Sequence, residues 1–262
     1  MTLSPLDEYP VHQVAMSMRH VATSDRNFYD RSYFNAHDGS GDLFCVFGMG
    51  QYPNLGVQDA FWLVADASTH RVVRASRALT DDRMDTTCGP LRIEVVEPLK
   101  VIRVVCEPTE HGPACDMTWT GSIPAHEEPG QRMRLNERQT FDSMRYAQTG
   151  RWEGWIEVEG ERRDVTPDRW WGSRDRSWGI RPVGEPEPAG IQAARPLEGF
   201  WWLYAPMQLD DFSILCIRQD EPDGTPVLRQ AVRVWPDGRV DDLGEPEVDL
   251  TFRDGTREVT GA

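Results

Sequence analysis

The sequence predicts an all-β protein made of two antiparallel β lobes, each a barrel or a sandwich. From about residue 43 to the end, apolar, β-branched and aromatic residues fall in short runs bounded by turn residues, a pattern typical of strands. The 22 glycines and 19 prolines are scattered at short intervals, which favours many turns and few long helices. The best helical window, 81–87, has no sustained apolar stripe, so we expect only short helical turns.

Strands are expected, in chain order, at 43–47, 60–64, 72–75, 91–96, 101–105, 117–122, 151–158, 200–207, 212–218 and 227–235. Between 91–96 and 101–105, the segment Glu97-Pro98-Leu99-Lys100 has hairpin spacing, with the proline where no ladder donor is needed. Pro236-Asp237-Gly238 predicts another tight antiparallel turn. Antiparallel strands in this number usually close into a barrel or stack as a sandwich, because both arrangements protect the sheet edges.

Proline and glycine crowd one stretch that separates the two expected lobes. Regular structure is interrupted there by Pro182, Gly184, Pro186, Pro188, Gly190 and Pro196. We therefore expect an N-terminal β lobe over residues 1–181, a linker over 182–198 and a second β lobe over 199–262. The 81 residues that follow Arg181 are few for an eight-stranded barrel. Either the second lobe is incomplete, or the chain is a fragment of a longer protein.

The charge balance excludes whole classes of partner. The chain carries 43 acidic and 28 basic side chains, a net charge of −15, which argues against binding to nucleic acids or to anionic membranes. Its apolar stretches are shorter than a membrane helix requires, and the N-terminus has no basic region followed by an apolar run. We expect a cytoplasmic protein that does not insert into membranes. The sequence gives no indication of its oligomeric state.

Common metal, redox and cofactor signatures are missing from the sequence. The five cysteines are an odd number without CxxC spacing, which predicts buried, reduced thiols. The histidines lack metal-ligand spacing, so we expect no metal site. The sequence also has no P-loop, dinucleotide fingerprint, Gly-Xaa-Ser-Xaa-Gly elbow or His-Glu-Xaa-Xaa-His motif. We accordingly expect no cofactor.

The densest chemical constellation is the segment 170–181, which holds three tryptophans, three arginines and one aspartate. Asp175 lies between Arg174 and Arg176, whose charges favour its ionised form, whereas burial against indoles favours the protonated form. We take Asp175 as a candidate catalytic acid or electrostatic anchor, with Arg174 and Ser177 as further catalytic candidates. The alternative is a structural Arg–Asp ion pair that ties the lobes together, and both remain open.

The run Arg174-Asp175-Arg176-Ser177-Trp178-Gly179 resembles the central motif of hydroxyneurosporene synthase (carotenoid hydratase)-like proteins. Weaker matches lie at Gly150–Trp155, Gly160, Trp171 and the Tyr52-Pro53-Asn54 turn. The resemblance implies two lipocalin-like β-barrels in tandem. It also implies chemistry on apolar substrates, because the family includes hydratases that add water to an isolated double bond of a polyene, and related barrels catalyse cyclisations. This chain has Arg-Asp-Arg-Ser where the hydratases carry an Asp-His-Asn form, a change that an isomerase or cyclase tolerates better.

Aromatic residues supply the candidate ligand-binding set. Indoles either pack a core or line an apolar ligand cavity, and both interpretations remain open. The candidates are Trp170, Trp171, Trp178, Trp201, Trp202 and Tyr204. His37 and Asp38 form the only adjacent His–Asp pair and are secondary candidates for a proton relay, although a solvated turn also explains them.

Two main hypotheses for function result. In the first, the protein is a hydratase-like or isomerase/cyclase-like enzyme that acts on an apolar terpenoid, polyene or polyketide-like molecule. Asp175 would then act as acid or electrostatic stabiliser, and tryptophan faces would stabilise a carbocation. In the second, the same cavity binds or carries an apolar ligand without turning it over. A lobe without any cavity, used only for structure or interaction, is a third possibility.

Overall fold

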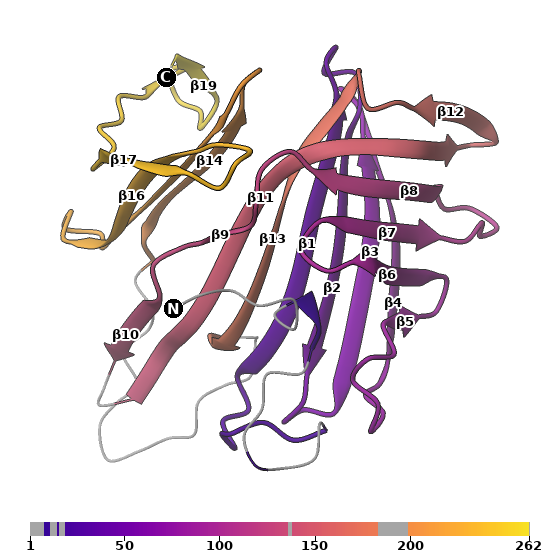
Figure 1. The fold of residues 1–262 in the computed structure, drawn as a ribbon, viewed down its shortest axis with the longest axis horizontal. Helices are drawn as coiled ribbons and strands as arrows, with labels where there is room; N and C mark the ends of the chain where they lie inside the picture. Colours follow the sequence, from indigo (N-terminus) through magenta and orange to yellow (C-terminus); the bar gives the residue numbers. More distant parts are fainter. Residues whose placement is uncertain (1–7, 11–14, 16–18, 136–137, 183–198, 262) are drawn as a thin grey trace.

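The computed structural model describes residues 8–10, 15, 19–135, 138–182 and 199–261. This part of the chain is all-β, as predicted, and contains no α-helix; its strands form sheets of thirteen, four and two strands (Figure 1). None of it forms a helix long and apolar enough to cross a membrane. The expected linker, 182–198, lies outside the described residues except for Pro182.

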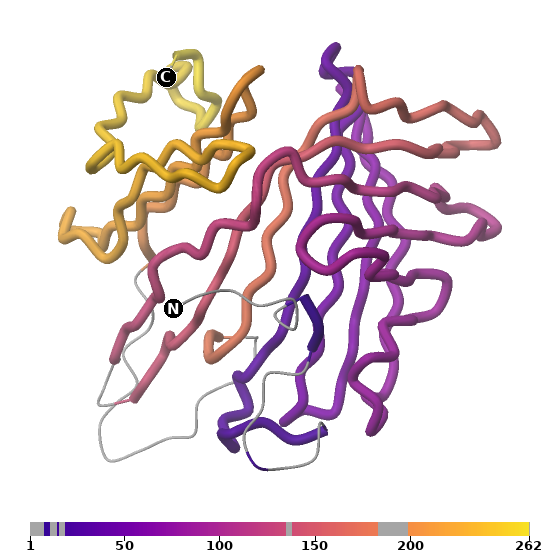
Figure 2. Tube along the Cα trace, in the orientation of Figure 1, coloured from indigo at the N-terminus to yellow at the C-terminus, as the bar shows by residue number. Residues whose placement is uncertain are grey.

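The thirteen-stranded sheet is antiparallel and forms a nearly closed, lipocalin-like barrel. Its main strand order is β4-β3-β2-β1-β13-β11-β8-β7-β6-β5, and β9, β10 and β12 pair with β11. The strands are β1 (Phe28–Asp38), β2 (Phe44–Tyr52), β3 (Val57–Ala65), β4 (His70–Ala78), β5 (Thr87–Cys88), β6 (Leu91–Glu97), β7 (Val101–Cys106), β8 (Ala114–Gly121), β9 (His126–Glu127), β10 (Gln131–Leu135), β11 (Arg138–Val158), β12 (Glu161–Val165) and β13 (Trp170–Ile180). The last strand of this sheet in sequence, β13, therefore lies between β1 and β11 (Figure 2).

One long strand, β11, makes the sheet curve. Its first half pairs with β13 and its second half with β8, so the chain turns from one wall of the barrel to the next without a break. Gly154 allows close contact in this second half, since its φ is +131° and an added β carbon would lie 2.1 Å from the carbonyl oxygen of Asp116. Only glycine tolerates this combination without strain.

The barrel interior is a packed aromatic and aliphatic core. Trp62, Trp119 and Trp152 are almost fully buried, and the rings of Trp119 and Trp152 meet edge to face with centroids 5.2 Å apart. Phe34 packs edge-on against Trp152 at 5.9 Å. The five cysteines are all buried and unpaired, which confirms the prediction of free thiols. This part of the barrel is therefore solid rather than a ligand chamber.

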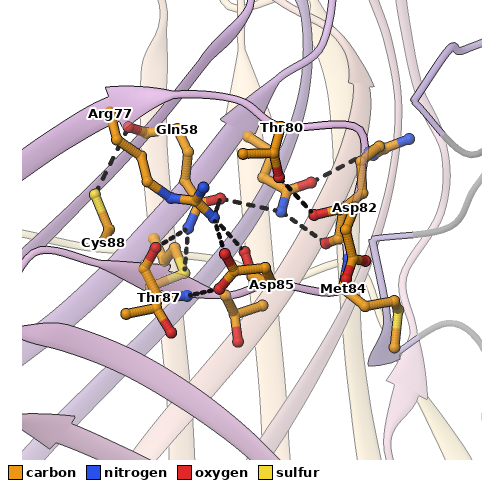
Figure 3. A network of polar contacts seen from close by, with 12 residues as sticks. Gln58, Arg77, Thr80, Asp82, Met84, Asp85, Thr87 and Cys88 are labelled. Carbon is orange, nitrogen blue, oxygen red and sulfur yellow. Dashed lines mark hydrogen bonds and ion pairs between the residues drawn. The ribbon is translucent and has the colours of Figure 1, made fainter.

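Side chains, rather than a strand ladder, join the two ends of the large sheet (Figure 3). The Arg77 guanidinium donates to the side-chain oxygen of Gln58 at 3.2 Å and to the backbone oxygen of Asp85 at 2.7 Å. It also pairs with the Asp85 carboxylate at 3.0 Å. The Gln58 amide donates to the carbonyl of Thr87, and the Cys88 thiol to the carbonyl of Gln58. These bonds connect β3 and β4 to β5 and the segment before it.

The second lobe is an open sheet in the order β14-β15-β16-β17, with a separate small hairpin. Its strands are β14 (Trp201–Gln208), β15 (Ser213–Asp220), β16 (Pro226–Val234) and β17 (Val240–Gly244), and the hairpin consists of β18 (Thr251–Phe252) and β19 (Val259–Gly261). The predicted Pro-Asp-Gly turn is present, with Trp235 N–H donating to the Arg239 carbonyl at 2.9 Å. Tyr204, Leu215 and Val232 pack against Ala147 of β11, so one face of this sheet covers the outside of the barrel.

Two strands in the middle of the barrel were not among those expected. β1 and β13 are rich in polar and charged residues, and the sequence pattern placed regular strands only from residue 43 onward. Their polarity has a structural reason, because each has one face toward the barrel interior and the other toward the second lobe. His37 and Asp38, for which a solvated turn was the alternative to a proton relay, are the last two residues of β1.

Glu8, eight residues into the chain, is held inside the barrel by β11 and β13. Its carboxylate oxygens accept hydrogen bonds from both terminal nitrogens of Arg174 at 2.9 Å, from the Tyr146 hydroxyl at 3.1 Å and from the Leu99 amide at 3.0 Å. Gln148 accepts from Arg174 Nε at 2.9 Å. The side chains of Glu8 and Arg174 are 3% and 1% exposed, so each charge depends on the other for compensation.

Replacing Glu8 with alanine should destabilise the fold by about 3 kcal/mol, because the buried Arg174 guanidinium loses its carboxylate partner. Urea unfolding followed by tryptophan fluorescence measures this loss. Glu97→Ala is the matched control, since Glu97 pairs with Lys100 on the surface and should contribute less than about 1 kcal/mol. Equal effects of the two substitutions would contradict a buried Glu8–Arg174 pair.

Candidate active site

The central strand β13 alternates its side chains between the barrel interior and the second lobe. Consecutive strand residues point to opposite faces of a sheet. Arg174 and Arg176 point inward, where Arg176 contacts the Asp30 carboxylate at 2.7 Å and Arg174 contacts Glu8. Asp175 and Ser177 point outward and line a cavity between the lobes. The two arginines that flank Asp175 in sequence thus have partners on the other side of the sheet.

The cavity between the lobes has a volume of about 560 Å³. Barrel strands β1, β2, β3, β11 and β13 form one wall, and residues of the second lobe form the other. Its ionisable lining consists of Tyr29, Arg31, Tyr33, Asp59, Glu128, Arg145, Asp175 and Arg181. Its large apolar lining consists of Met49, Phe61, Phe141, Phe200, Trp202, Ile217 and Leu228. A charged floor thus faces apolar walls in a space of the size that small ligands occupy.

Asp175 is half-buried on the floor of this cavity. Its carboxylate makes no hydrogen bond or ion pair with any residue that the structure describes. Burial raises its pKa above the usual value, while the positive charges of Arg145, Arg181, Arg174 and Arg31 act in the opposite direction. A carboxyl group with a raised pKa and no fixed partner is available to exchange a proton with a bound molecule.

A second carboxyl group, that of Glu128, lies on the same wall. Its Oε2 contacts Nε of Arg145, whose guanidinium stacks on the rings of Tyr204 at 4.6 Å and Trp202 at 5.2 Å. Burial raises the pKa of Glu128 to about 7 although Arg145 lowers it, and the negative charge of Asp175 raises it further. Arg145 stays charged because Glu128, Asp175 and the two aromatic rings all favour the cation.

Several polar atoms of this cluster are buried without a hydrogen-bond partner among the described residues. They are Oε1 of Glu128, Nη2 of Arg145 and the hydroxyl of Tyr204. Burial, together with the charges of Glu128 and Asp175, raises the pKa of Tyr204 well above its usual value, so it remains a neutral phenol. Unsatisfied buried polar groups are costly and concentrate at functional sites. The cluster is therefore suited to a polar group on a ligand.

The other predicted site residues do not share this cavity. Trp170 belongs to the barrel core, and Trp178 lies on the inner face with its ring 6.4 Å from that of Tyr146. Trp171 lies on the outer face beside His37, at 6.4 Å between rings, away from the cavity lining. Trp201 points to the opposite face of the second sheet from Trp202, and Arg218 covers its ring at 5.2 Å. The structure thus brings together Asp175, Ser177, Trp202 and, through Arg145, Tyr204.

The secondary pair, His37 and Asp38, shows no side-chain relay. The His37 ring nitrogen lies 3.3 Å from the backbone oxygen of Asp38, while the Asp38 carboxylate accepts from the Ser40 hydroxyl at 2.8 Å and from Gly41 N–H at 3.2 Å. This is the geometry of a turn stabilised by an aspartate. The described residues also hold no cluster of three or more side chains suited to a metal ion.

Sequence reasoning missed Glu128, Arg145, Arg31 and Arg181. Only the two-residue alternation of β1 and β11 could have indicated that Arg31 and Arg145 face the same side as Asp175. That inference requires the register of β1 and β11 against β13, in which Arg31 and Arg145 both lie opposite Ser177. A single sequence does not specify this register. Glu128 lies outside any long strand and has no local signal at all.

Comparison with known proteins gives a family and a fold. The model of a family of unknown function (DUF8625) matches residues 3–262. The chain belongs to that family. No curated protein matches the sequence significantly.

Solved structures with the same fold are distant in sequence. A protein assigned as AttH from Nitrosomonas europaea has a TM-score of 0.56 at 14% identity over 82% of this chain and 67% of its own. Kievitone hydratase from Nectria haematococca has a TM-score of 0.52 at 13% identity, over 89% of this chain and 72% of its own. CghA with Sch210972 has a TM-score of 0.54 at 12% identity, over 88% and 64% respectively. The chain thus spans about two thirds of the length of these structures.

The raised pKa of Glu128 predicts a specific pH dependence of stability. Because its pKa is about 7 in the folded protein and 4.5 without perturbation, folding favours its protonated form, and this contribution is lost as the pH rises through 7. Between about pH 5 and pH 8, wild type should lose about 2 kcal/mol more stability than Glu128→Gln, which cannot ionise there. Urea unfolding at both pH values measures the difference. If the unfolding free energies of the two proteins changed with pH in parallel, Glu128 would not be a buried carboxyl group with a raised pKa.

Proposed function

We propose that this protein is an enzyme that binds an apolar small molecule between its two lobes and acts on it with the carboxyl group of Asp175. The observation that carries the proposal is the placement of Asp175: a half-buried carboxylate without a described partner, on the floor of a cavity of about 560 Å³ with apolar walls. The structural carboxylates Glu8 and Asp30 differ from Asp175, because each of them forms an ion pair with an arginine.

The fold comparisons support a hydratase-like or cyclase-like reaction. Kievitone hydratase is named for a hydratase activity and shares the fold, as does CghA in its complex with Sch210972. The Arg-Asp-Arg-Ser-Trp-Gly run adds the resemblance to hydroxyneurosporene synthase-like proteins, and we propose membership of that superfamily. Substrates of terpenoid, polyene or polyketide-like character fit a cavity with this apolar lining.

The chemistry begins with proton transfer from a protonated carboxyl group to a substrate alkene. Asp175 donates its proton to one alkene carbon, and the positive charge that develops on the other carbon is stabilised by an aromatic face such as that of Trp202. In a hydration, water adds to the cation and returns a proton to the carboxylate. In an isomerisation or a cyclisation, the carboxylate regains its proton from a different carbon. Each route restores Asp175 and uses no further reactant except water.

The hydratase motif has a histidine after its aspartate, which corresponds to position 176 in this chain. A histidine at that position would not reach the cavity. Position 176 points into the barrel, where Arg176 binds Asp30. Glu128, whose pKa is about 7, is the second proton-exchanging group on the cavity wall instead. We propose that Glu128 and Arg145 orient the substrate and set the charge around Asp175, and that Ser177 and Tyr33 contribute hydroxyl groups beside it.

Replacement of Asp175 by asparagine tests the proposal. The substitution removes the exchangeable proton and should lower turnover by about 100-fold or more, measured by mass spectrometry of products from a panel of polyene, terpenoid and polyketide-like compounds. Binding of a neutral apolar dye such as Nile red should persist. Asp164→Asn, an exposed change on β12, is the control with the same loss of charge. Joint loss of dye binding and thermal stability in the Asp175 variant would instead indicate a structural carboxylate in a carrier protein.

A further inference from the structure

Two arginines on the cavity wall have no acidic partner among the residues that the structure describes. Arg31 of β1 and Arg181, directly after β13, both line the cavity between the lobes. Neither forms an ion pair within 4 Å with any acidic residue that the structure describes. The Arg181 side chain lies over the ring of Tyr29 at 4.5 Å and makes no described hydrogen bond. Arg31 donates from Nε and Nη2 to the Tyr52 hydroxyl, and the remaining guanidinium donors of these two cavity-lining arginines have no described acceptor.

The lack of a described carboxylate partner distinguishes Arg31 and Arg181 from other buried arginines of this protein. Arg174, Arg176 and Arg145 each contact a carboxylate directly. At the cavity, the two positive charges instead lie close enough to repel each other, and burial together with this repulsion lowers the pKa of Arg181. Burial of unpaired charge is costly unless a partner arrives. The arrangement therefore favours an anion that enters with the ligand.

The carboxylates nearby do not satisfy these arginines. Asp59 is separated from Arg31 by Tyr52, whose hydroxyl accepts from Arg31 Nε at 2.7 Å and donates to Asp59 at 3.4 Å. Asp175 interacts with Arg31 and Arg181 only at longer range. Tyr52 and Tyr29 thus hold the two guanidiniums in place without neutralising them, as expected of a preorganised anion site.

We propose that Arg31 and Arg181 bind a carboxylate group of the substrate, whose apolar remainder packs against Phe200 and Trp202 on the opposite wall. This inference rests on the proposed function of the cavity and defines its substrate class: an amphipathic acid rather than a pure hydrocarbon. Guanidinium groups are suited to this task because their planar, forked donors match the two oxygens of a carboxylate.

Binding of the carboxylate would also act on Asp175. The charged and titratable groups around that residue are Arg31 and Tyr33 from β1, Arg145 from β11, Arg174 on the opposite face of β13, Tyr204 from β14, Glu128, and Arg181. An anion that neutralises Arg31 and Arg181 removes part of the positive charge that keeps Asp175 ionised. Substrate binding would then shift Asp175 towards the protonated form, which is the form that donates to an alkene.

A pair of matched probes tests the inference. Decanoate and 1-decanol share an apolar chain and differ in charge, because decanoate is ionised at about pH 8. Isothermal titration calorimetry at that pH, or displacement of Nile red, should show that wild type binds decanoate about 10- to 100-fold more tightly than decanol, the range expected for hydrogen bonds to charged groups. The variant Arg31→Gln/Arg181→Gln should lose this preference while its affinity for decanol stays the same. Arg163→Gln, an exposed change on β12, should keep it.

The possible results separate this inference from the proposed function. Equal affinity of wild type for the two probes would overturn the carboxylate site while leaving an apolar cavity intact. A preference for decanoate that survives in the double variant would overturn it as well, as would failure of decanoate to bind to wild type. Arginine-dependent binding of decanoate, combined with unchanged turnover in Asp175→Asn, would support the carboxylate site and reject Asp175 as the catalytic acid.

Discussion

The alternation of side chains along β13 is the constraint on which the site depends. A strand between two neighbours presents successive residues to opposite faces, so the charged run from Arg174 to Arg176 divides between two environments. Arg174 and Arg176 enter the barrel and are compensated there by Glu8 and Asp30. Asp175 faces the second lobe and lacks such compensation among the described residues. One strand thus anchors the fold on one face and presents the candidate catalytic carboxyl group on the other.

The two faces differ in how completely their carboxyl groups are hydrogen-bonded. On the inner face, the Glu8 carboxylate accepts from a guanidinium, a phenol and a backbone amide, which is the coordination of a structural ion pair. On the outer face, Glu128, Arg145 and Tyr204 each leave a buried polar atom without a described partner. Buried polar atoms without a described partner also occur inside the barrel, at Arg176 Nε, Trp62 Nε1 and Trp119 Nε1. The difference between the faces therefore lies in their carboxyl groups, since Glu8 has its charge compensated directly, whereas Asp175 and one oxygen of Glu128 have no described partner.

The sequence was sufficient to predict the fold class and most of the turn-bounded strands. Short apolar runs between glycine and proline residues favour the strand conformation locally, so they can be recognised without knowledge of the tertiary structure. It was not sufficient for β1 or β13, whose charges conceal the strand period. It also predicted that Arg174 would act with Asp175, whereas alternation places the two on opposite faces. Trp201 and Trp202 diverge for the same reason. The charged residues that share the cavity with Asp175 include Arg31, Arg145 and Glu128. Strand register and loop placement bring them there, and both depend on long-range packing rather than on local sequence.

The open second sheet is sufficient to cover the cavity on the outer face of the barrel. The raised pKa values of Asp175 and Glu128 arise first from burial, and on the outer face of the barrel that burial requires a cover. Tyr204, Leu215 and Val232 fix one face of the second sheet to β11, and Phe200 and Trp202 extend the cover over the cavity. Closing this sheet into a barrel would add nothing to the desolvation of the carboxyl groups, since only its inner face contacts them. Burial of the two carboxyl groups therefore depends on one well-packed sheet face, not on a second complete barrel.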